Sequence, residues 1–158
     1  MQSTEGNIQQ KGLSGDMGYV HSEFVKAIAE ELIEKHPDLI TVKEASPVIA
    51  YLESDKGKSH NGGIVHADCE KVKPKMKEFV AYDYIITAYM PNCAELTENQ
   101  WKILIFHELL HVDCDRDLDG VLTCRIRPHD IEDFHQVTDR FGTYWSQDQS
   151  VGDILEGM

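Results

Sequence analysis

Apolar side chains recur every three or four positions between residues 22 and 36, which is the spacing of one face of an α-helix. Ser22 is a residue type that favours the N-cap of such a helix, and Pro37 disfavours its continuation. Charged residues occupy the opposite face, so we expect this helix to pack on a core as part of the scaffold. Its apolar positions are Phe24, Val25, Ile28, Leu32 and Ile33.

The middle of the chain changes to a pattern typical of strands. Two short apolar runs, 47–52 and 64–69, each fit a strand, and the polar stretch between them carries a turn signal at Asn61-Gly62. A further run at 82–89 is rich in aromatic and β-branched residues. Between the last two runs lies a basic stretch that we interpret as a solvated loop. Its lysines are Lys71, Lys73, Lys75 and Lys77.

A second helix is predicted from residue 97 to residue 112. Thr97 followed by Gln100 has the form of a capping box, in which each side chain bonds the other residue's backbone N–H. The apolar positions that follow are numerous enough to bury most of this helix. Inside the apolar run stands His107-Glu108-Leu109-Leu110-His111, an H-E-x-x-H sequence.

The spacing of this motif suits a metal. Positions i and i+4 of a helix lie on the same face, so His107 and His111 can both reach one Zn²⁺ ion. Glu108 projects beside that face, where it can accept a proton from a metal-activated water without being a ligand. The alternative is a pair of ordinary helix histidines with a surface glutamate. Against that alternative, three polar residues interrupt the helix where its buried side should be.

A catalytic zinc ion usually has three protein ligands. We favour His129 as the third, because the apolar spacing after it predicts a helix over residues 128–145 that would hold it rigidly. An acidic residue between 113 and 133, or His135, is the alternative ligand. Carboxylates near His129 could accept a hydrogen bond from a ligand imidazole. They are Asp130, Glu132 and Asp133.

Together these motifs resemble the putative phage metallopeptidase family, whose outline is similar to zincin-like and SprT-type proteins. The resemblance rests on HELLHV followed by RPHDIEDF, preceded by DYIITAY and ENQWKILIF, and it covers roughly residues 22–145. It implies a compact α+β single domain, with a small mixed or antiparallel sheet packed on an N-terminal helix, the HExxH helix and a C-terminal helix. It also implies one zinc ion per chain, held by His107, His111 and His129, with Glu108 as general base.

The segment between the two motifs contains D-x-D-x-D-G, the opening of a calcium-binding loop. The twelfth position of that loop would be Ile126, where the full motif requires glutamate. We therefore favour an acidic turn between two short strands over a calcium site. The carboxylates concerned are Asp115, Asp117 and Asp119.

The composition of the chain limits the classes of binding partner that we expect. The 158 residues include 28 acidic and 15 basic ones, for a formal net charge of −13. This charge argues against binding to nucleic acid or to an anionic membrane surface. Residues 1–20 show no apolar signal sequence, so we expect a cytoplasmic protein, in the host cell if phage-encoded. The four cysteines form no C-x-x-C pair and are expected to be reduced thiols, with a Cys114–Cys124 pairing as the alternative.

We therefore predict a leader at 1–20, a folded domain at 21–147 and a tail at 148–158. The domain is expected to be a zinc metallopeptidase that cleaves an unidentified peptide or protein. Rival interpretations are a metal-stabilised binding or regulatory domain without turnover, and hydrolysis of a non-peptide amide or ester. We expect residues 82–89 to form the sheet edge that receives the substrate. Candidates for stabilising the oxyanion are Tyr84, Tyr144, His135 and Arg127, whereas His60 and His66 are expected to have no metal role.

Overall fold

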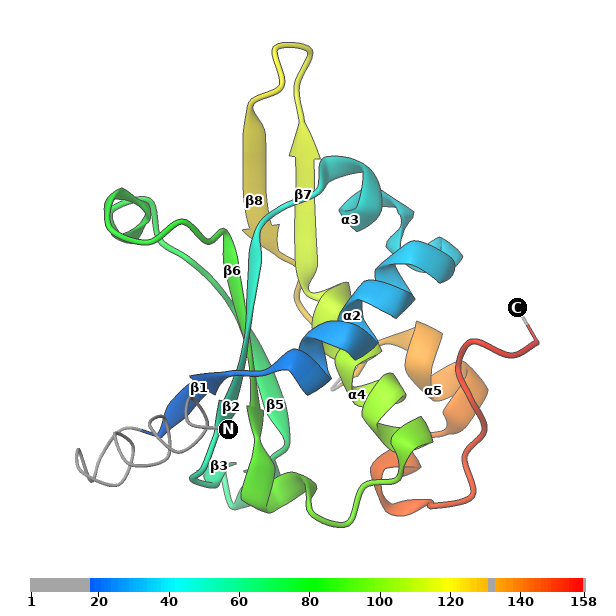
Figure 1. The fold of residues 1–158 in the computed structure, drawn as a ribbon. Helices are drawn as coiled ribbons and strands as arrows, with labels where there is room; N and C mark the ends of the chain where they lie inside the picture. The colour runs from blue at the N-terminus through cyan, green and yellow to red at the C-terminus, as the bar shows by residue number, and fades with distance from the viewer. Residues whose placement is uncertain (1–17, 131–132, 158) are drawn as a thin grey trace, which may run out of the picture.

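A computed structural model describes residues 18–130 and 133–157 of the chain. The fold is a single α+β domain built on a four-stranded mixed sheet with the strand order β1-β2-β6-β5. The helices lie on one face of this sheet (Figure 1). β2 and β6 run parallel, while β1 and β5 flank them in antiparallel pairing. The strands are β1 (Tyr19–His21), β2 (Ile49–Ser54), β5 (Ala67–Lys71) and β6 (Tyr84–Tyr89).

The first predicted helix is confirmed as α2 (Glu23–Lys35). The Ser22 hydroxyl accepts a hydrogen bond from the N–H of Val25 at 3.0 Å, as an N-cap side chain does. Val25 and Leu32 on its inner face are fully buried. The helix ends at His36, and the chain continues through η1 (Pro37–Leu39) and α3 (Ile40–Ala45) to β2.

The second predicted helix is confirmed as α4 (Glu98–Leu110), including both hydrogen bonds of its capping box. Its apolar side chains are buried on all sides, because α2, β5 and the C-terminal segment surround it. The helix is shorter than expected: His111 is its C-cap, and Val112 already begins a strand.

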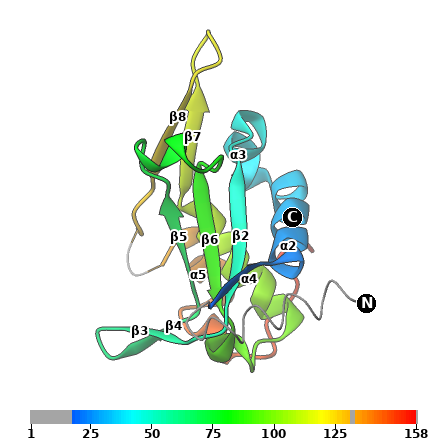
Figure 2. The same ribbon diagram turned by 60° about the vertical axis from the view of Figure 1, so that its left-hand side comes forward.

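Two hairpins project from this core (Figure 2). β3 (Lys58–His60) and β4 (Gly63–Val65) meet at Asn61-Gly62, where both residues have positive φ, so the predicted turn is confirmed. β3 lies in the polar stretch where no strand was expected, and the run 64–69, expected as one strand, is divided between β4 and β5. β7 (Val112–Arg116) and β8 (Leu122–Ile126) enclose the acidic turn, as expected. Short 3₁₀ turns, η2 (Met76–Glu78) and η3 (Met90–Cys93), flank β6.

The predicted helix over 128–145 is wrong. Helix α5 covers only His135–Phe141, and η4 (Trp145–Gln147) follows a turn at Gly142, whose φ is +83°. The chain is still extended at Phe134, because the bonds of Asp133 to His107 on α4 and to the Trp145 indole hold this part of the segment out of a helix.

The expected sheet edge is also wrong. Residues 82–89 contain β6, which is paired on both sides, so the outer strands are β1 and β5. The segments predicted as leader and tail contribute to the packing within the described range. Residues 19 and 20 lie in β1, and Ile154 is buried. Residues 1–17 lie outside the described residues. No helix in the described part of the chain is both long and apolar enough to cross a bilayer.

Candidate metal centre

Three histidines from two separate segments meet at one point. His107 lies in the last turn of α4, His111 caps that helix, and His129 lies in the segment that follows β8. Their candidate ligand atoms all lie within 4.8 Å of one another. The Nε2 atoms of His107 and His129 are 3.0 Å apart. Among the described residues, this is the one group of three or more side chains gathered closely enough to hold a metal ion.

Two of these imidazoles are oriented by acceptors on their outer side. His107 Nδ1 donates to Asp133 Oδ1 at 2.5 Å, and His111 Nδ1 donates to the carbonyl oxygen of Arg127 at 2.8 Å. The other oxygen of Asp133 accepts from the indole N–H of Trp145 at 2.9 Å. Because the Nδ1 atoms are occupied, the Nε2 atoms of both rings are left for a metal.

Asp133 is thus the one of the three predicted outer acceptors that the structure places on a histidine. Asp130 instead accepts from the Arg127 guanidinium at 3.1 Å and from the N–H of His135. Glu132 lies outside the described residues.

The aromatic ring of Phe134 packs against all three imidazoles. The Phe134 centroid lies 5.2 Å from that of His107, 5.0 Å from that of His111 and 5.3 Å from that of His129, with the rings edge-on. Phe134 is fully buried, and the Arg127 guanidinium lies 4.5 Å from its centroid. Sequence reasoning assigned Phe134 only to a helix face; its position directly after Asp133 was the available signal.

Glu108 lies beside the histidines without touching solvent. Its side chain is 4% exposed, and Oε2 is 4.0 Å from His107 Nε2. Its buried Oε1 has no hydrogen-bond partner within the described part of the chain. Burial raises the pKa of this carboxyl to about 7, although neighbouring His107 acts in the opposite direction.

The histidines themselves differ in charge state. Burial lowers the pKa of His111 to about 4, which favours the neutral ring that a metal requires. Burial acts in the same direction on His107, but the hydrogen bond to Asp133 and the nearby Glu108 charge hold the pKa of that ring above its ordinary value.

This set of donors fits a zinc ion. Three imidazoles are a ligand set that catalytic zinc uses, and the buried, partnerless oxygen of Glu108 needs a polar group opposite it. A metal with a bound water would meet both requirements.

The acidic turn has no such arrangement. Asp115 pairs with Arg125 at 2.8 Å, and Asp117 Oδ1 accepts from the backbone N–H groups of Asp119 and Val121. In these contacts the carboxylates bond groups of the turn and of its own hairpin. Among the described residues, no cluster that could hold a metal ion forms there. The structure therefore gives the calcium interpretation no support.

The candidate oxyanion stabilisers are dispersed. The buried Tyr84 hydroxyl donates to the Arg125 carbonyl oxygen at 2.8 Å and accepts from the Arg125 N–H, so it joins β6 to the β7–β8 hairpin. Tyr144 is largely exposed, and the His135 ring faces Asp139. Of the four candidates, Arg127 lies next to the histidines. Its guanidinium contacts the Phe134 ring, and its backbone carbonyl accepts from His111.

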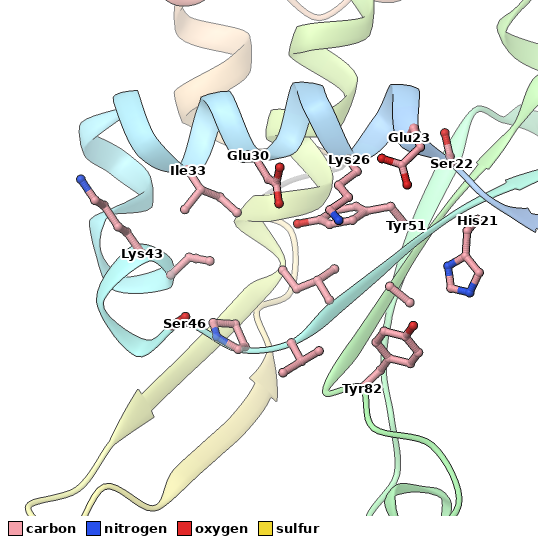
Figure 3. A pocket seen from close by; sticks show the side chains of 15 residues that line it. His21, Ser22, Glu23, Lys26, Glu30, Ile33, Lys43, Ser46, Tyr51 and Tyr82 are labelled. Atoms are coloured by element: carbon pink, nitrogen blue, oxygen red, sulfur yellow. The ribbon is translucent and has the colours of Figure 1, made fainter.

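A cavity of about 520 Å³ lies elsewhere, between α2 and β2 (Figure 3). Its lining includes Lys26, Glu30, Lys43 and Tyr51, and it includes none of the three histidines. The metal centre and this cavity are therefore separate features.

Comparison with known proteins gives one match. The sequence model of a family described as putative phage metallopeptidase matches residues 17–157, which is most of the chain. No curated protein and no solved structure matches.

Proposed function

We propose that this chain, which belongs to the putative phage metallopeptidase family, is a zinc-dependent peptidase. The observation that carries the proposal is the meeting of three imidazoles beside the buried carboxylate of Glu108, whose Oε1 has no hydrogen-bond partner among the described residues. A structural zinc site closes its coordination shell with four protein ligands, whereas three histidines leave a position open for chemistry.

The residues have distinct roles in this proposal. His107, His111 and His129 would hold the ion. Asp133 and the Arg127 carbonyl fix the orientation of the His107 and His111 rings. When bound, zinc supplies a Lewis acid that makes water nucleophilic near neutral pH and polarises the substrate carbonyl.

Glu108 is the general base. Its carboxylate accepts a proton as the water oxygen bonds to the peptide carbonyl carbon, and returns that proton to the amide nitrogen as the C–N bond breaks. A carboxyl whose pKa burial raises to about 7 is suited to both transfers near neutral pH.

The free edge of β5 is the place for the substrate. Register with β6 directs the main-chain groups of Ala67, Cys69 and Lys71 away from the sheet, and β5 is the last strand in the sheet order. β5 packs against α4, the helix that carries Glu108, which supports this edge as the place for the substrate. An extended peptide would add here as a further strand.

The first test is the metal content of untagged protein purified without chelator, measured by elemental mass spectrometry. We expect about one zinc ion per chain. Glu108→Gln should retain that zinc and lose roughly 10²- to 10⁴-fold in the cleavage rate of a peptide library.

Three results would count against the proposal. If no transition metal is tightly bound, even after zinc is added back, the assignment of a metal centre is wrong. Activity that survives Glu108→Gln would remove Glu108 as the base. Zinc binding without cleavage of any peptide would favour a metal-stabilised binding domain.

A further inference from the structure

The segment that joins β5 to β6 is a basic region on an acidic protein. We call residues 71–80 the basic loop. Its first seven positions hold four of the 15 basic residues in a chain with a net charge of −13. All four side chains are exposed: Lys71, Lys73, Lys75 and Lys77.

The same loop presents large apolar side chains to solvent. Phe79 is 79% exposed and Met76 is 48% exposed, and Val80 lies beside them with 36% exposure. Lysines alone would suit a solvated loop, but apolar groups gathered among them are a feature of interaction surfaces.

The loop is held in place at its base. Lys77 Nζ lies 2.8 Å from Asp83 Oδ1, and the other oxygen of that carboxylate accepts from the N–H of Val48 at 2.8 Å. Val72 is buried and donates its N–H to the carbonyl oxygen of Asp83 at 2.9 Å. The exposed side chains therefore project from a segment whose base is fixed to the sheet by these contacts.

The loop lies at one end of the edge that carries the substrate in the proposed function. Along β5 the chain passes Cys69, beside Glu108, and reaches the loop at Lys71. Lys77 is held by the Asp83 carboxylate, and β5 itself contacts β8, a strand of the hairpin that leads to His129. Figure 2 shows the loop at this end of β5.

We propose that the basic loop binds acidic side chains of the substrate, on one side of the bond that is cleaved. This inference rests on the proposed function, and it assigns a substrate class to that site. An extended peptide advances about 3.3 Å per residue, so Lys71 lies about 7 Å along the strand from the position beside Glu108. The acidic side chains would therefore occupy positions about two to five residues from the cleaved bond, with Met76 and Phe79 covering their apolar stems.

Charge complementarity favours a short acidic peptide over a larger polyanion. Fields of exposed charges are screened within about 8 Å at physiological ionic strength, so a peptide that runs past Glu70 on β5 meets the lysines only where it reaches the loop. A nucleic acid or an anionic membrane would also meet the acidic remainder of the molecule.

The test compares decapeptide libraries randomised around a central bond. One pair carries Glu or Gln at positions two to five on the N-terminal side of the bond, and a second pair carries them on the C-terminal side. For zinc-loaded protein we expect kcat/KM to be about tenfold or more higher for Glu than for Gln in one of the pairs, by analogy with charge-assisted contacts. This ratio should fall as salt is raised from 0.05 to 0.5 M.

Lys73→Glu/Lys75→Glu should bring that ratio below one. The matched control is Lys26→Glu/Lys43→Glu, which makes the same charge change at the cavity between α2 and β2 and should leave the ratio unchanged. A wild-type ratio near one in both pairs, or an equal loss in the two double variants, would overturn the proposal.

If no library is cleaved, the proposed function fails, and binding tests the loop by itself. Fluorescence anisotropy would then compare labelled Glu and Gln peptides of fixed sequence. Tighter binding of the Glu peptide that only Lys73→Glu/Lys75→Glu abolishes would support the loop as the acidic-peptide site, and equal binding of both peptides would overturn it.

Discussion

Asp133 connects the candidate metal centre to the packing of the domain. One oxygen accepts from His107 Nδ1 and from the N–H of Phe134, and the other accepts from the indole of Trp145. The side chain is largely buried, so each of these bonds is shielded from water. An asparagine has the same size but offers one oxygen, and its NH₂ group can only donate, so the donors on one side of the residue would lose their acceptor.

Asp133→Asn should therefore weaken zinc binding by about 10- to 100-fold, the usual effect of losing an outer hydrogen-bond partner of a ligand histidine. Competition with a chromophoric chelator measures this affinity. Asp130→Asn is the matched control, because Asp130 bonds Arg127 and His135 but no ligand ring. Equal affinities of the two variants for zinc would show that Asp133 does not orient His107.

Much of the candidate site could be predicted from the types and the spacing of its residues. The H-E-x-x-H spacing selects His107, Glu108 and His111, and His129 with a neighbouring carboxylate follows from the ligand count. The contribution of Phe134 could not be predicted, because it depends on the approach of the 127–134 segment to the end of α4. That approach is a tertiary contact without local periodicity.

Among the elements, the β7–β8 hairpin separates the candidate ligands at the end of α4 from His129. Tyr84 joins this hairpin to the sheet: its hydroxyl donates to the carbonyl oxygen of Arg125 and accepts from the N–H of the same residue. The side chain is fully buried, so water cannot replace these bonds. The position of the hairpin relative to β6 depends on this contact.

Tyr84→Phe should lower the free energy of unfolding of the zinc-free protein by about 1–3 kcal/mol, because it leaves the partly buried N–H and carbonyl of Arg125 without this partner. Urea denaturation measures the change. Tyr82→Phe is the matched control, since Tyr82 lines the cavity between α2 and β2 and makes no contact with the hairpin among the described hydrogen bonds. Superimposable unfolding curves for the two variants would contradict this role of Tyr84.

The elements that could be predicted have strong local signals. The capping residues Ser22 and Thr97 begin α2 and α4 where expected, and the acidic turn joins two strands. The apolar spacing after residue 128 was helical, but the bonds of Asp133 to His107 on α4 and to the Trp145 indole hold the chain before His135 out of a helix. The β3–β4 hairpin has no buried apolar face, so only its Asn61-Gly62 turn left a signal.

For the whole molecule, the α+β class was expected from the resemblance to the family, but the strand order was not. β6 is central because β2 pairs with it in parallel across a long connection, and β5 then becomes the free edge. Pairing partners depend on which faces must be buried together, and short apolar runs carry little information about that choice. This is why the expected substrate edge was assigned to the wrong strand.

Zinc should stabilise the whole domain, because its ligands come from two parts of the chain. His107 and His111 belong to the end of α4, whereas His129 follows β8. With free zinc about 1,000-fold above its Kd, mass action would add about 4 kcal/mol to the stability of the folded state. For a domain of this size that corresponds to a rise in Tm of roughly 8–16 °C.

Differential scanning calorimetry with and without chelator measures this shift. His129→Ala should remove most of it, because the two histidines of α4 alone cannot connect the helix to the 127–134 segment. The Tm of chelated His129→Ala protein should stay close to that of chelated wild type, since His129 is exposed and its loss opens no cavity. A zinc-dependent shift of full size in His129→Ala would move the third ligand to another residue, whereas the expected loss would make His129 the link that joins the two segments through the metal.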